Sequence, residues 1–144
     1  MKALIVHVPY EHRGGEDVHV DALVQGYQKI GITPILFPPD REPPRNLLGP
    51  AVRSLAPGFS LPELEAFWKK AHASYIHVHN VFPVLGPRFF RWAMAKKIPL
   101  VMTVHNHRYF CTNGLALRDK KICKDCFHSK IAWRPVVHHC NRSF

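Results

Sequence analysis

The stretch from Pro99 to Phe110 carries the residue types best suited to chemistry. Its first part, Leu100–Val104, has the length and β-branched content of a buried strand. His105 follows this run directly, and more polar and ring-bearing side chains come after it. Ligands of open α/β sheets bind in the crevice beyond the carboxyl ends of the strands. The position of His105 therefore predicts a residue that faces a ligand; the alternative is a histidine that caps the backbone or lies half-exposed.

All four cysteines of the chain lie in its last part, with the spacing C-x11-C-x2-C-x13-C. A central C-x2-C flanked by two cysteines suits a tetrahedral structural zinc site, because thiolates are soft, deprotonated donors. The peptide between them is short and polar and builds no core, so a metal would supply folding energy. The alternatives are four free or buried thiols, or one or two disulfides. The predicted ligands are Cys111, Cys123, Cys126 and Cys140, with His128, His138 and His139 as substitutes.

A strand, a glycine turn and a helix open the chain. Ala3–Val6 is an apolar run that predicts a buried strand, and the pair Gly14-Gly15 separates it from a helix that Gly31 ends. Glycine lets the backbone approach a phosphate, and a helix N-terminus attracts anions. This is not the G-x-G-x-x-G fingerprint, and Glu16 and Asp17 would repel a phosphate. The alternative is a tight turn whose acidic residues complement the helix dipole. The predicted buried face comprises Val20, Leu23, Val24, Tyr27 and Ile30.

The elements that follow alternate between strands and helices. Strands are predicted at Thr33–Phe37, Ser74–Asn80 and Pro99–His105, and helices after the capping box Ser60–Glu63 and from about Arg88 to Lys97. This order predicts an α/β, Rossmann-like domain over residues 1–110, with a mainly parallel sheet and helices on both faces. Residues 111–144 are expected to form a small cysteine-rich, zinc-knuckle-like segment packed on the same domain.

This topology brings polar residues to one edge of the sheet. Alternation along the third strand places Ile76 and Val78 on one face and His77 and His79 on the other. His79-Asn80 and His105-Asn106 both end strands at the carboxyl edge, and the glycine turn lies there too. We therefore expect three separate stretches to converge on one crevice.

Composition bounds the partners of the chain. Its 144 residues fit one domain, and a formal net charge of +10 implies an anionic partner: nucleic acid, lipid headgroups or phosphorylated small molecules. The proline-rich stretch Pro38–Phe59 is expected to be irregular, with a short helix at Asn46–Leu55. Arg41, Arg45 and Arg53 there contact an anionic acceptor or are simply solvated. Without a membrane-spanning run or signal peptide, we expect a cytoplasmic protein with reduced cysteines.

Four stretches together resemble the N-terminal domain of a GT-B glycosyltransferase of family 4, the large retaining family. They are the glycine turn Arg13–Glu16, the histidine-bearing strand Ile76–Asn80, the strand Val101–Asn106, and the segment Arg108–Gly114 with the later cysteines. The last of these resembles a cysteine-bearing subgroup. The four stretches cover nearly the whole chain, in the order and spacing of the family.

The resemblance implies transfer of a sugar from a nucleotide-diphosphate donor, with retention at the anomeric carbon and no catalytic metal. The N-terminal domain mostly holds the acceptor (a cell-envelope, lipid-linked or other saccharide), and the C-terminal domain binds the nucleotide. The residues implied are His105 as the catalytic contact to the donor sugar, Gly14 and Gly15 at the donor diphosphate, and His79, Asn80 and Arg108 in the acceptor cleft.

The sequence departs from this family in lacking the C-terminal, nucleotide-binding domain. We therefore expect a truncated product or fragment that does not turn over alone. A basic face could dock on an anionic membrane at its inner side, or simply be solvated; its residues are Arg88, Arg91, Lys96 and Lys97. The alternative function is a zinc-stabilised basic nucleic-acid-binding or interaction module. Nucleic acid is not the expected partner, because the basic residues are spread along the chain rather than clustered.

Overall fold

The computed structural model describes residues 1–8, 13–38, 60–81, 85–127 and 134–140. The chain separates into two compact units, Met1–Thr103 and Val104–Phe144. The boundary therefore comes at the end of the last strand of the first unit, earlier than the expected boundary after residue 110. The predicted helix at Asn46–Leu55 and the arginines at 41, 45 and 53 lie outside the described residues.

The first unit contains a four-stranded parallel sheet, as predicted. Its strands are β1 (Lys2–Val6), β2 (Thr33–Phe37), β3 (Tyr75–Val78) and β4 (Leu100–Met102), in the order β2-β1-β3-β4. β4 is shorter than the predicted run and is largely exposed: Val101 is 47% exposed and Met102 44%. Within the described part of the chain, β4 is an edge strand that pairs with β3 alone, so no further strand shields it.

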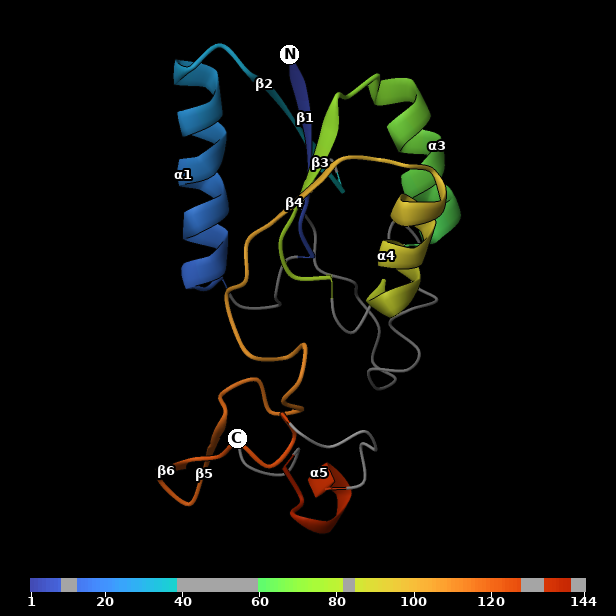
Figure 1. Cartoon of the computed structure of the whole chain (residues 1–144). Coiled ribbons are helices and arrows are strands. Elements are labelled where there is room, and N and C mark those ends of the chain that lie inside the picture. The colour runs from blue at the N-terminus through green and yellow to red at the C-terminus, as the bar shows by residue number, and fades with distance from the viewer. Residues whose placement is uncertain (9–12, 39–59, 82–84, 128–133, 141–144) are drawn as a thin grey trace. The chain divides into compact units, whose positions relative to one another are not determined.

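Helices cover both faces of the sheet, which also agrees with the prediction. α1 (Gly15–Lys29) lies against one face, and α3 (Leu61–Ala71) and α4 (Gly86–Ala95) lie against the other (Figure 1). This architecture is compatible with a Rossmann-like fold. None of the described helices has the length and apolar character needed to cross a membrane.

Local sequence signals fix the helix ends. The Ser60 hydroxyl accepts a hydrogen bond from the Glu63 amide at 3.3 Å, and the Glu63 carboxylate accepts one from the Ser60 amide at 2.8 Å, so the capping box is formed. Gly31 follows α1 with a φ of +76°, as expected of a glycine that ends a helix. Ile30 was expected on the buried face, but it is the C-cap of α1 and is 70% exposed.

The two faces of the sheet differ in chemistry. The face toward α3 and α4 is apolar, and its core includes Leu4, Val6, Ile76, Val78, Leu64 and Phe89. Because side chains alternate along a strand, the intervening positions point toward α1. There, His7 and His77 are buried and make polar contacts with α1. Buried histidine side chains therefore lie between the sheet and α1.

The second unit contains little regular structure. β5 (Leu117–Arg118) and β6 (Lys121–Ile122) form an antiparallel hairpin, and α5 (Arg134–Val137) is a single helical turn. Asp119 and Lys120 have φ values of +50° and +60°, which indicates a type I′ turn. This turn joins the two strands of the hairpin.

Candidate functional site

A buried histidine between two carboxylates lies at the carboxyl end of β1. His7 Nε2 is 3.0 Å from Asp17 Oδ1, and His7 Nδ1 is 3.2 Å from Glu16 Oε1. All three side chains are at most 8% exposed. Burial by itself lowers the pKa of His7, but Glu16 and Asp17 outweigh it and raise the pKa above 6.5. The two carboxylates therefore favour the protonated form of His7.

The same two carboxylates tie the glycine turn to the strand ends. Asp17 Oδ2 accepts a hydrogen bond from the backbone N–H of Gly14 at 2.8 Å, and Glu16 Oε1 accepts one from the backbone N–H of Asn80 at 3.1 Å. Asn80 in turn accepts a hydrogen bond from the Val8 amide at 3.1 Å through its carbonyl. The start of α1 is thus joined to the ends of β1 and β3, at the carboxyl edge of the sheet.

These contacts bear on the predicted role of Gly14 and Gly15 in binding a phosphate. The Gly14 amide, expected to face a phosphate, already donates to Asp17. Gly14 has an extended backbone, and a Cβ built at Gly14 or Gly15 would meet nothing within 4 Å. Neither glycine is therefore required by local crowding. Gly15 is the better candidate for a phosphate contact, because the Gly14 amide is occupied.

A second group of histidines lies between the sheet and α1. His77 Nδ1 is 2.7 Å from the Tyr27 hydroxyl and His77 Nε2 is 2.8 Å from Thr103 Oγ1, so both ring nitrogens have partners. The His77 ring stacks on that of His79 at 4.6 Å between centroids. Burial and a hydrogen bond with Tyr75 raise the pKa of Tyr27, so its hydroxyl stays protonated.

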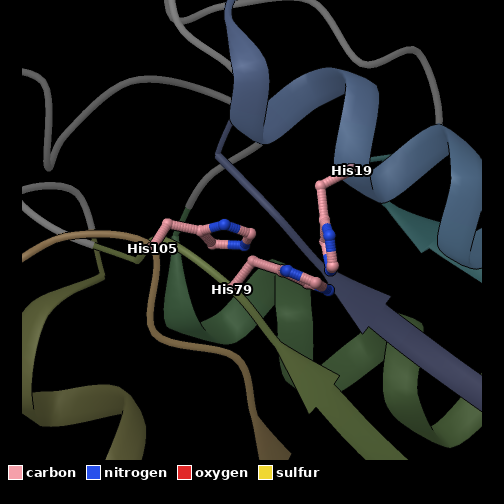
Figure 2. A group of neighbouring side chains, drawn as sticks. All are labelled: His19, His79 and His105. Atoms are coloured by element: carbon pink, nitrogen blue, oxygen red, sulfur yellow. The ribbon is translucent and has the colours of Figure 1, made fainter.

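His79 is the centre of this group. Its side chain is fully buried, and its ring centroid is 6.1 Å from that of His7 and 5.7 Å from that of His19. Figure 2 shows the rings of His19, from α1, and His79, from the end of β3, turned toward each other. The third residue labelled there, His105, belongs to the second unit.

The sequence-predicted site residues are therefore divided between the two units. Gly14, Gly15, His79 and Asn80 come together at one edge of the first unit. His105 and Arg108 belong to the second. The Arg108 amide donates to Asn106 Oδ1 at 3.0 Å. The Arg108 side chain packs against Gly114, whose φ is +78° and where a Cβ would lie 2.9 Å from Arg108 Cγ.

The four cysteines of the second unit are all free thiols. Burial raises the pKa of Cys126, and the charges that Cys111, Cys123 and Cys140 would carry raise it further. Cys126 therefore lies close enough to the other three cysteines for their charges to interact with it. In the described residues, however, they do not form a ligand group tight enough for a metal ion, so the zinc site stays a prediction. Of the substitute ligands, His128 lies outside the described residues.

Asp125, inside the C-x2-C sequence, connects the parts of this unit. Its carboxylate lies 2.8 Å from Arg118 of the hairpin, 3.8 Å from Arg134 and 3.9 Å from His138. The hydrogen bond from Arg118 lowers the pKa of Asp125 most, and Arg134 and His138 add to the effect. The C-x2-C turn is therefore attached both to the hairpin and to the segment that carries Cys140.

Sequence reasoning gave no site role to several polar residues on the α1 face, some buried and some exposed. Strand alternation had already placed His77 on the same face as His79, and His7 is assigned to a face of β1 in the same way. The pairing of Glu16 and Asp17 with His7 left no such signal, since it depends on how α1 docks. The missed residues are His7, Glu16, Asp17, His19, Tyr27, His77 and Thr103.

Comparison of the chain with protein-family models, with curated proteins and with solved structures gives no match.

Proposed function

We propose that this chain is the acceptor-binding, N-terminal part of a retaining glycosyltransferase that uses a nucleotide-diphosphate sugar. A second α/β domain supplies the nucleotide site. The main support is the junction of the glycine turn with the ends of β1 and β3, where Glu16 accepts the Asn80 amide hydrogen bond at 3.1 Å. This is the edge at which parallel α/β sheets bind ligands. His79 and Asn80, both buried at this edge, are the residues that we assign to the lining of the cleft for a saccharide or lipid-linked acceptor.

The proposed transfer proceeds by departure of the nucleotide diphosphate and development of positive charge at the anomeric carbon. Stabilisation of the leaving group is the main electrostatic task. The backbone at Gly15 and the positive end of α1 would face the diphosphate, and His105 would contact the donor sugar. Arg108 adds a cation for a phosphorylated acceptor. The net charge of +10 favours such anionic ligands, and also a surface at the inner face of a membrane.

The four cysteines are proposed to hold one structural zinc ion. Their thiolates match the tetrahedral donor set that zinc prefers. The polar contacts of Asp125 attach the C-x2-C turn to the hairpin and to the segment that carries Cys140. A closed four-thiolate site would stabilise this unit and take no part in sugar transfer.

The test is a nuclear magnetic resonance titration of the full chain with a panel of UDP- and GDP-sugars, short prenyl phosphates and oligosaccharides. We expect at least one ligand to shift the amide signals of Gly15, His79, Asn80 and His105 together. The variant His105→Ala should weaken that binding about tenfold or more while the other amide signals stay unchanged. His72→Asn, at an exposed histidine on α3, is the matched control.

Two outcomes would contradict this function. One is the absence of any shift at these residues with every sugar nucleotide, prenyl phosphate and oligosaccharide at millimolar concentration. The other is a stronger response to an oligonucleotide, with affinity that falls steeply with salt. The second result would establish the nucleic-acid-binding alternative in its place.

A further inference from the structure

We propose that His19 and His79 form a binding site for a divalent transition-metal ion of the zinc type, separate from the four cysteines. A ring nitrogen of His19 lies within 4.8 Å of a ring nitrogen of His79. Neutral imidazole is a favoured ligand of Zn²⁺, at about 2.0–2.1 Å from the metal. A small rotation of the exposed His19 side chain brings both nitrogens to one ion. Water completes the coordination, so the site stays open to exchangeable ligands.

The surroundings of His79 favour a fixed ligand. His79 is fully buried, and its ring is stacked on His77, which is itself held between Tyr27 and Thr103. Groups behind a ligating histidine that fix its orientation strengthen metal binding. His19 belongs to the same regular helix, α1, whose first turn is attached to the ends of β1 and β3. Both donors therefore come from segments that the fold holds in place.

The charge beside the pair favours a cation over an anion. The ring of His7 is 6.1 Å from that of His79, and His7 is paired with Glu16 and Asp17. Two carboxylates face a single imidazole, so the net charge of this group is negative in either protonation state of His7. A net negative charge beside His79 attracts a divalent ion. This inference does not depend on the proposed glycosyltransferase function.

The experiment uses the full chain, first saturated with Zn²⁺ at the cysteines and then titrated with Ni²⁺, which is paramagnetic, at pH 7.5. We expect amide signals near His19 and His79 to broaden before those of the second unit. His19→Ala should weaken the binding about tenfold or more, because it removes one of two protein ligands. His19 is exposed, so its replacement leaves the fold intact.

A second variant tests whether weaker Ni²⁺ binding results from the loss of a ligand or from a change in the fold. His79→Gln keeps a polar side chain in the buried position and should also weaken Ni²⁺ binding, whereas His72→Asn, at an exposed histidine on α3, should leave it unchanged. Binding that survives His19→Ala unchanged, or broadening confined to the second unit, would overturn the proposal. Loss in His19→Ala with retention in His72→Asn supports it, whether or not any sugar nucleotide binds.

Discussion

At the scale of single residues, the most consequential arrangement is the side chain of His7 between Glu16 and Asp17. Those carboxylates also accept hydrogen bonds from the backbone N–H groups of Gly14 and Asn80. One histidine thus balances the charge that keeps the glycine turn against the strand ends. A buried charge that loses its partner is costly, typically by about 3–5 kcal/mol. His7 is therefore a structural support of the candidate site as well as its neighbour.

The raised pKa of His7 makes stability depend on pH. A raised folded-state pKa gives a stabilising contribution that is complete below the unfolded value of 6.5 and is lost as pH rises through the folded value. We expect the free energy of unfolding of the native protein to fall above pH 6.5. His7→Gln should be less stable by about 3 kcal/mol at pH 6 and should show a flatter profile above it. The measurement is urea unfolding from pH 5.5 to 9.

His72→Asn is the control for this titration, because His72 is an exposed histidine outside the site. It should keep the slope of the native protein. If His7→Gln has the same slope as the native protein, the pKa of His7 is not raised in the folded state.

At the scale of elements, helix ends and helix pairing decide where functional residues can lie. The basic face predicted on α4 is partly used within the fold. Lys96 lies 3.1 Å from Glu65 of α3, and Trp92 donates to the same carboxylate at 3.2 Å. The hydrogen bonds from Lys96 and Lys69 lower the pKa of Glu65. Lys96 therefore connects two helices and is less available to a membrane surface than the sequence indicated.

Gly26, inside α1, and Gly31, just after its C-cap, provide a matched test of what this helix contributes to the stability of the first unit. Gly31 has a φ of +76°, whereas Gly26 lies inside the helix, and a Cβ would meet nothing within 4 Å at either position. Gly31→Ala should destabilise the first unit by about 1–2 kcal/mol, since alanine is strained in the left-handed region. Gly26→Ala should stabilise it by about 0.5–1 kcal/mol. Thermal unfolding of both variants measures the difference; equal effects would contradict the assigned end of α1.

At the scale of the whole molecule, the chain consists of two units with different sources of stability. The first has an apolar core between the sheet and the helices α3 and α4, centred on Ile76, Val78 and Phe89. The second exposes several of its large apolar side chains, including Ile122 at 78%. A unit with so little buried surface usually needs a metal or disulfides, and its cysteines are free.

This contrast predicts that metal removal affects one unit only. The purified chain should contain about one zinc ion, and a chelator should release it. The amide signals of the β5–β6 hairpin should then collapse while those of β1 and β3 persist. Cys126→Ser should reproduce the effect, and His138→Asn should retain the metal because the four thiolates already complete the site. A metal-free chain with an intact hairpin would remove zinc from the second unit.

The sequence by itself determined most of the first unit. Alternation in β3, the capping box at Ser60 and the glycine after α1 are local signals, so the strands and helices followed from neighbouring residues. It also marked Gly14, Gly15, His79 and Asn80 as one edge of a parallel sheet. The exposure of β4 could not be read locally, because burial of a strand depends on what lies beside it.

Only the tertiary structure decided the chemistry of the α1 face. From the sequence, Glu16 and Asp17 were expected to complement the helix dipole. The packing of α1 against the sheet instead places them in contact with His7 and the strand ends. The pairing of His77 with Tyr27, fifty positions away, likewise depends on helix placement. Local patterns report which face a residue occupies, whereas the free energy of burying a charge depends on the partner that folding supplies.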